Sequence, residues 1–358
     1  MKFILHKKTK IYICSPANID TGGPTDLHQL AFILKKKFNR KVYMSYYPLQ
    51  KKNPIHKNYK LFKIPFVKKI PDLKENILII PEAFYFIRLS RKYSNIQKGL
   101  WWLSIDNYLK HRFVNKNNRI IQILIKIPHK IYVLFSKITS FQFKNITFFK
   151  YLKFIYINLS LNNVFKIENI KVNLVHSKYQ FNVLKSKKIK SVYLSDYIRD
   201  EYFKKSRTIL LKKKKNIICY NPSKSTIFFQ KFIKLNPDIK FFPLTNLSLS
   251  EMITALSRSK IYMDFGFHPG QDHLPREAAI LKNCIITNKE GSAAIYDDLP
   301  IKDEFKFYEK KENFYKIRKK IDLVFNKFSR ELIKFQYYRH YLHGQKNLFE
   351  NQIEKIFS

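Results

Sequence analysis

The chain has 358 residues, which is longer than one average domain and predicts two domains of about 150 to 200 residues each. Hydrophobic residues make up 45% of it, with 32 Phe and 23 Tyr, so packed cores are expected and a largely disordered chain is excluded. Lysine and arginine number 69 against 26 acidic residues, a formal net charge of +43. This excess favours anionic partners, namely nucleic acid, phosphorylated small molecules or an anionic membrane face, although an AT-rich genome would encode a similar composition.

The three cysteines, Cys14, Cys219 and Cys284, lie far apart inside apolar runs and lack the spacing of metal ligands. They are therefore expected to be buried thiols in a reducing cytosol. The first residues do not have the pattern of a signal peptide, and no apolar run reaches the ~18 residues that span a bilayer. We expect a cytoplasmic protein.

Residues 1–200 are predicted to form the first α/β domain. A buried strand, Ile11 to Ala17, leads into a turn with the pair Gly22-Gly23 and then an amphipathic helix. Glycines at such a turn let a ligand approach the amides of a helix start, but they also occur in any tight turn. Further strands are expected at 41–47, 77–80, 99–105, 172–177 and 192–194. Asp106 follows the fourth of these six strands, where it either binds a substrate or caps the next helix.

Two segments of the first half stand apart by their charge. Residues 119–163 alternate apolar runs with single lysines, which favours either contact with a membrane surface or packed helices whose lysines extend into solvent. Residues 201–215 contain the run Lys212 to Lys215 and are predicted to be a solvated linker.

Residues 216–330 are predicted to form a second α/β domain, followed by a C-terminal helix in residues 331–358. Strands are expected at 216–220, 239–244, 261–265, 284–287 and 305–308, and the spacing of Ser248 and Glu251 predicts a capping box. A helix is expected to open on Pro275, because proline gives up only an amide that the first turn leaves unpaired. Alternation of strands and helices predicts a doubly wound sheet, whose ligands bind beyond the carboxyl ends of the strands.

Four motifs spread over both halves carry a resemblance to a known family. They are SPAN-x-x-TGGP-x-x-x-HQL from Ser15, WWLS-x-DN from Trp101, YNP-x-K ending at Lys224, and DFG-x-HPG-x-D-x-x-PREAA from Asp264 followed by GSAA. Together they resemble glycosyltransferases of the GT-B fold, and in particular a bacterial group encoded among capsule and lipopolysaccharide genes. The resemblance implies two Rossmann-like domains facing across a cleft, with C-terminal helices.

The resemblance also implies a reaction. A sugar, of the hexosyl type, would move from a nucleotide-diphosphate sugar onto a surface polysaccharide or a lipid-linked oligosaccharide, without a metal or other cofactor. An acceptor at the anionic leaflet would place the protein peripherally on the inner face of the cytoplasmic membrane.

The roles that the family implies fall on named residues of both domains. Glu277 would hold the donor ribose, although a carboxylate near a helix start also stabilises that helix. The donor diphosphate would be neutralised by Lys224, Arg276 and the amides of Gly291, Ser292 and Ala293. His268 is a candidate for contact with the donor sugar or phosphate. Gly22, Gly23 and His28 are the expected acceptor-binding residues, with Asp106 as a candidate base.

Retaining members often carry a second glutamate eight residues before Glu277, where this chain has Pro269. The stereochemical outcome and the donor base therefore stay open. Two other functions also remain. One is a basic nucleic-acid-binding protein, but the positive charge is spread along the whole chain and no nucleic-acid-binding motif is found. The other is a non-catalytic GT-B protein that binds glycan.

Overall fold

The structure is a computed structural model that describes residues 1–48, 53–114 and 167–357. It divides into two compact units: the first comprises Met1–Asp196 with Leu348–Ser358, and the second comprises Tyr197–Asn347. The basic segment 119–163 lies outside the described residues, so both hypotheses for it stay predictions. Among the described residues, no helix is both long and apolar enough to cross a bilayer.

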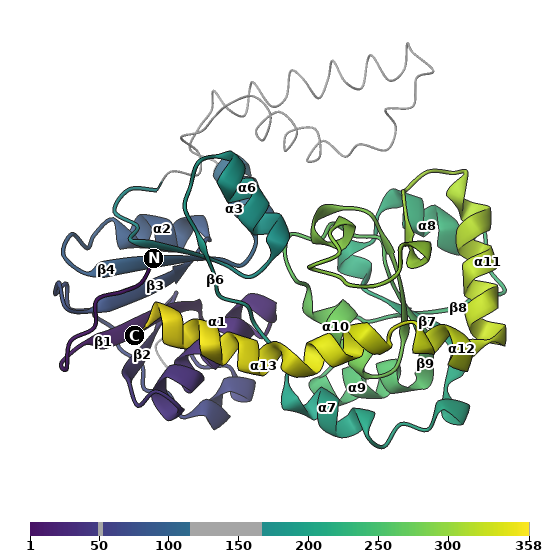
Figure 1. The fold of residues 1–358 in the computed structure, drawn as a ribbon, viewed down its shortest axis with the longest axis horizontal. Helices are drawn as coiled ribbons and strands as arrows, with labels where there is room; N and C mark the ends of the chain where they lie inside the picture. The colour runs from purple at the N-terminus through teal and green to yellow at the C-terminus, as the bar shows by residue number, and fades with distance from the viewer. Residues whose placement is uncertain (49–52, 115–166, 358) are drawn as a thin grey trace, which may run out of the picture. The chain divides into compact units, whose positions relative to one another are not determined.

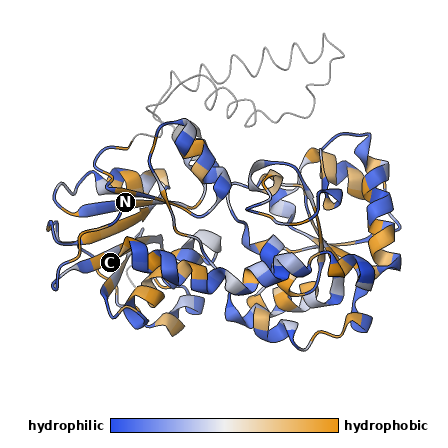
Figure 2. Ribbon diagram, viewed as in Figure 1, coloured by the Kyte–Doolittle hydropathy of each residue, from blue (hydrophilic) through white to orange (hydrophobic). Residues whose placement is uncertain are grey.

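The first unit is built on a six-stranded parallel sheet in the order β2-β1-β3-β4-β5-β6. Figure 1 shows α1 on one face of this sheet and α2, α3 and α6 on the other. Because both faces are covered, the central strand β3 is a continuous apolar run and every one of its residues is buried, whereas the edge strand β2 alternates between buried and more exposed residues. Figure 2 shows hydrophobic stretches, coloured orange, along this sheet. The strands are β1 (Lys10–Pro16), β2 (Lys41–Tyr47), β3 (Ile77–Pro81), β4 (Gln97–Trp102), β5 (Val172–Val175) and β6 (Val192–Tyr193). The helices are α1 (Gly22–Lys36), α2 (Phe84–Ser90), α3 (Ile105–Val114) and α6 (Lys178–Ser186).

The last helix, α13 (Gln336–Ile356), begins in the second unit and ends in the first. Phe349 stacks on the buried ring of Trp101, with 6.3 Å between centroids, and the backbone amide of Phe3 donates to the carbonyl of Ile356. The side chain of Gln352 accepts a hydrogen bond from the amide of Ser195 at 2.6 Å. The C-terminal helix therefore completes the core of the first unit, a role that the sequence did not indicate.

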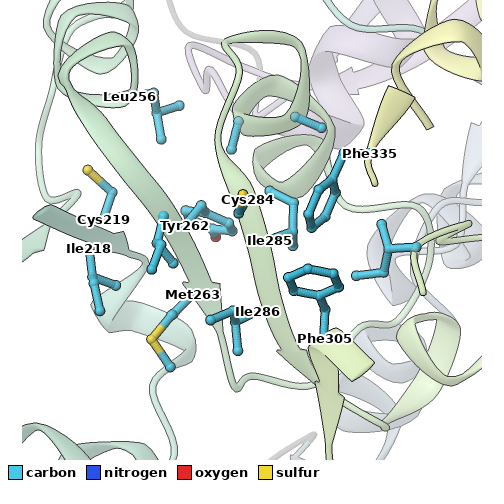
Figure 3. Close-up of a cluster of buried hydrophobic side chains, with 14 of the residues drawn as sticks. Ile218, Cys219, Leu256, Tyr262, Met263, Cys284, Ile285, Ile286, Phe305 and Phe335 are labelled. Carbon is cyan, nitrogen blue, oxygen red and sulfur yellow. The ribbon is translucent and has the colours of Figure 1, made fainter. Parts of the chain in front are cut away.

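The second unit has a five-stranded parallel sheet in the order β11-β10-β9-β7-β8. Figure 1 shows α8 and α11 on one face and α7, α9 and α10 on the other, while Figure 3 shows the apolar core around β9 and β10. The strands are β7 (Lys215–Tyr220), β8 (Lys240–Pro243), β9 (Ser259–Asp264), β10 (Cys284–Asn288) and β11 (Lys306–Phe307). The helices are α7 (Asp200–Ser206), α8 (Ile227–Lys234), α9 (Leu249–Arg258), α10 (His273–Ile280), α11 (Asn313–Asn326) and α12 (Phe328–Ile333).

Several local predictions are confirmed. Ser248 and Glu251 form the capping box at the start of α9, and the three cysteines are free and buried. Burial raises the pKa of the Cys284 thiol to about 12, so it is an unreactive thiol at neutral pH.

Residues 201–215 differ from the expected solvated linker. They contain most of α7, a 3₁₀ turn at Leu211–Lys213 and the start of β7. Lys214 is only 5% exposed, and its ammonium donates to the carbonyls of Leu256 and Ser259. A run of lysines is therefore not solvated throughout, because the long stem of one of them enters the unit.

Candidate functional site

The carboxyl edge of the second sheet gathers polar residues from three neighbouring strands. Asp264 ends β9 and Asn288 ends β10, while Lys224 lies in the 3₁₀ turn (Pro222–Lys224) that follows β7. His268 belongs to the loop between β9 and α10. Ligands of doubly wound sheets bind at this edge, so it is the candidate donor site.

Four charged side chains of this edge alternate in sign. Lys224 Nζ lies 2.7 Å from Asp272 Oδ2, and the same oxygen lies 2.9 Å from His268 Nδ1. The other ring nitrogen of His268 lies 3.6 Å from Asp264 Oδ1. Burial lowers the pKa of His268, but Asp264 and Asp272 outweigh it and raise that pKa above its ordinary value. The two carboxylates on either side of His268 therefore favour its protonated form, and Lys224 pairs with the outer carboxylate, Asp272.

The same groups place ligand atoms of Asp264, His268 and Asp272 within 4.8 Å of one another, a spacing that metal ligands share. Burial by itself raises the pKa of Asp272, but Lys224 and His268 lower it well below its usual range. The carboxylates thus already face two cations of the protein, which leaves this cluster better suited to binding an anion through Lys224 than to binding a metal.

Two glycines bring the loops of the site into backbone contact. Gly291 has a φ of +59°, and a Cβ there would lie 2.0 Å from the carbonyl oxygen of His268. A Cβ on Gly266 would lie 2.6 Å from Cβ of Lys224. The loops after β7, β9 and β10 can therefore touch only because these two positions lack side chains.

The backbone amides after β10 that were predicted to bind the diphosphate mostly donate hydrogen bonds within the unit. The amide of Ser292 donates to the carbonyl of His268 at 2.9 Å, and the amide of Ala293 donates to Glu290 at 3.2 Å. The hydroxyl of Ser292 donates to the carbonyl of Gly270. These residues hold the site loops together, and a role in binding a diphosphate would require at least two of these bonds to open.

Of the two predicted cations, Lys224 is the accessible one. Its side chain is 30% exposed, whereas Arg276 is 2% exposed. The guanidinium of Arg276 donates to the carbonyls of Asp272 and Gln271 and to the side chain of Gln345 on α13. Arg276 therefore fastens the site loop to α13, and Lys224 is the cation that a phosphate could reach.

Helix α10 begins two residues earlier than predicted. Asp272 is its N-cap and His273 its first residue, so Pro275 is third and Glu277 is fifth. Proline is accepted there because the first four amides of a helix have no partner within the helix. Glu277 Oε1 lies 3.8 Å from His273 Nδ1, and the carboxylate is 10% exposed. Glu277 lies beyond the first turn of α10, which argues against the alternative that its carboxylate serves to stabilise the start of the helix.

The predicted acceptor residues lie in the first unit. Gly22 and Gly23 are the first two residues of α1, and a Cβ on Gly23 would lie 3.3 Å from Cδ1 of Leu103. His28 is 1% exposed, hydrogen-bonds to Tyr46, and stacks on Tyr59 with 3.9 Å between ring centroids. The structure thus gives His28 a packing role within the unit.

Asp106, the candidate base, lies in the first turn of α3 and is 4% exposed. His176 and Asp196 follow β5 and β6, with 3.5 Å between their nearest nitrogen and oxygen atoms. The first unit therefore also collects titratable groups at the carboxyl edge of its sheet.

Glu82 belongs to the same edge and was not singled out from the sequence. It follows β3 directly, and its carboxylate accepts a hydrogen bond from the amide of Leu103 at 3.0 Å. Burial raises its pKa to about 7, against the backbone amides and His176, which lower it. The signal was an acid immediately after a fully apolar strand. A carboxyl group that titrates near neutrality is suited to proton transfer.

Comparison with known proteins bears on the fold. No protein-family model and no curated protein matches the chain. Among solved structures, a glycosyltransferase from Rickettsia africae ESF-5 is 14% identical, with a TM-score of 0.60 and 98% of both chains covered. Anabaena Alr3699/HepE in complex with UDP-glucose is 8% identical, with a TM-score of 0.56 over 97% of this chain and 98% of that one. An α-glucosyltransferase in complex with UDP is 12% identical, with a TM-score of 0.54 over 97% and 99%. The likeness is one of fold, and this chain has the two Rossmann-like domains of these GT-B proteins.

Proposed function

We propose that this protein is a glycosyltransferase that binds a nucleotide-diphosphate sugar at the carboxyl edge of the second unit's sheet. The observation that carries the proposal is the partly exposed Lys224, whose ammonium contacts Asp272, beside the buried His268 that contacts the same carboxylate. Proteins of the same fold are described in complex with UDP or UDP-glucose, which supports a donor of this class.

The geometry suggests how the donor would be held. Lys224 would exchange Asp272 for the diphosphate, and the imidazolium of His268 would then compensate the charge left on Asp272. Stabilising the departing diphosphate is the main electrostatic requirement of glycosyl transfer, and two protein cations would meet it without a metal. Glu277, whose side chain is 10% exposed, would accept hydrogen bonds from the ribose.

For the acceptor we propose a surface polysaccharide or a lipid-linked oligosaccharide bound by the first unit. The net charge of +43 supports an acceptor at an anionic leaflet, with the protein peripheral on the inner face of the cytoplasmic membrane. The fold alone does not choose the acceptor, since an α-glucosyltransferase of this fold is described with UDP and a DNA.

The donor proposal is tested by calorimetry with UDP, GDP, CMP and dTDP. Lys224→Ala should weaken the best-binding nucleotide about tenfold or more, because a charge-assisted contact to phosphate is lost. The control is Lys231→Ala, which removes an exposed lysine of the same unit and should leave affinity unchanged. Glu277→Gln should weaken UDP more than dTDP, which lacks the 2′ hydroxyl. Equal affinities for Lys224→Ala and Lys231→Ala would contradict the assignment.

A further inference from the structure

A cavity of the second unit lies at the edge of its sheet opposite to the candidate donor site. It has a volume of about 430 Å³ and is bordered by the residues where β7 and β9 begin, by the end of α11 and by the start of α12. Lys260 at this edge and Asp264 at the candidate donor site are near the two ends of the same strand, β9. The cavity, which we call the amino-edge pocket, is therefore separate from the donor site.

The lining of the amino-edge pocket is strongly cationic. Five of its ten residues are Lys212, Lys214, Lys260, Lys327 and Arg330, and within the described part of the chain none of the ten is acidic. Lysine and arginine make up only 69 of the 358 residues of the whole chain. Cations are therefore enriched in the pocket well beyond their frequency in an already basic protein.

Two of these lysines are fixed by the fold. The ammonium of Lys214 donates to the carbonyls of Leu256 and Ser259 at 3.1 and 2.7 Å, and Lys260 donates to the carbonyl of Phe325 at 2.9 Å. An ammonium has three N–H donors, so each lysine keeps donor capacity beyond these bonds. Neither has a carboxylate within salt-bridge distance among the described residues. Main-chain carbonyls thus position two lysine amino groups that have no carboxylate partner among the described residues.

An anion in the pocket would favour the protonated form of Lys214. Burial lowers the pKa of Lys214 to about 7, and burial also lowers the pKa of Lys260. Burying an ammonium without a counter-charge is unfavourable, and an anion in the pocket would relieve that cost. A volume of about 430 Å³ lies within the range of small-molecule sites and exceeds what a single inorganic phosphate needs.

We propose that the amino-edge pocket binds a phosphate-bearing anion at a site distinct from that of the sugar donor. Lys214 and Lys260 would form the preorganised wall of the site. The exposed side chains of Lys327, which precedes α12, and Arg330, which lies in α12, would bind the phosphate from the other side. Several cations converging on one group suit a phosphate ester of high charge density. Such an ester can be a soluble phosphorylated metabolite or the headgroup of an anionic lipid.

Two charge-matched double variants test the proposal. The pocket variant combines Lys327→Gln with Arg330→Gln, and the control combines Lys310→Gln with Lys311→Gln, which are exposed residues of the same unit. Both are made in a chain that also carries Lys224→Ala, so that the candidate donor site contributes less. Inorganic pyrophosphate is titrated calorimetrically, and sedimentation is measured with phosphatidylcholine vesicles with and without phosphatidic acid. Both assays are run at about 0.15 M salt, which screens unspecific attraction.

The pocket variant should lose affinity at least about tenfold for one of the two probes, while the control changes less than about twofold. A loss for pyrophosphate alone assigns a soluble ester, and a loss of sedimentation with phosphatidic acid assigns a lipid headgroup. If the two variants behave alike, or if neither probe binds the parent chain, the pocket is ordinary solvated surface and the proposal is wrong.

Discussion

Replacing Gly291 by alanine should destabilise the second unit and the candidate donor site together. The added Cβ would lie 2.0 Å from the carbonyl oxygen of His268, and Gly291 has a φ of +59°. The left-handed backbone costs about 1 to 2 kcal/mol for a residue with a side chain. Moving a backbone atom out of the way adds about 1 to 3 kcal/mol, as in an overpacked core. We expect the free energy of unfolding of the second unit to fall by about 2 to 5 kcal/mol.

The same substitution at Gly344 should change the free energy of unfolding in the opposite direction. It lies in α13 within the second unit, and a Cβ there would meet nothing within 4 Å. Gly344→Ala should therefore stabilise that unit by about 0.5 to 1 kcal/mol, because alanine loses less conformational entropy in a helix. Urea unfolding monitored separately for each unit measures both changes. If the free energy of unfolding of the Gly291→Ala variant lay within about 0.5 kcal/mol of that of the parent protein, the close packing of the two loops would be refuted.

Two further predictions concern pH. The pKa of Glu82 is about 7 in the folded protein, whereas an ordinary glutamate has a pKa of 4.5, so folding favours the protonated form. The first unit should therefore lose about 3 kcal/mol of stability as the pH rises from 4.5 to 7. Glu82→Gln should abolish that loss in urea unfolding at pH 5 and 8, and parallel curves for both proteins would contradict it. The pKa of Lys214 is lowered from 10.5 to about 7, so folding favours its neutral form and the second unit should gain stability between pH 7 and 10.5. Lys214→Met should flatten this rise, whereas an unchanged pH slope would show that Lys214 is not buried.

The sheets could be predicted from the sequence because their central strands, such as β3 and β10, are buried on both faces and read as apolar runs. The predicted strand 41–47 coincides with β2, and most other strands agree within one or two residues. Helix starts were less certain, as α10 shows, since Pro275 fits the third position as well as the first. The return of α13 to the first unit was not predicted, because an amphipathic helix does not indicate which core covers its apolar face.

The candidate site was predicted in part. Lys224 and His268 could be assigned to loops at the same edge because parallel strands place their carboxyl ends together. The bridge that Asp272 makes between them, and the burial of Arg276 and His28, depend on side-chain packing that spacing does not encode. Glu82 was visible as an acid after a strand, but only its burial showed that its pKa lies near neutrality.

The path of α13 has a consequence for how the protein is made. The second unit occupies one continuous stretch of chain, Tyr197–Asn347, so all its residues have been synthesised before the first unit has its last ones. Phe349, Ile353 and Phe357 are buried in the first unit, although they follow the whole of the second. During translation the first unit therefore lacks the residues that cover Trp101 until the whole of the second unit has been synthesised. Removing a few residues from the far end of α13 would consequently damage the unit that begins the chain.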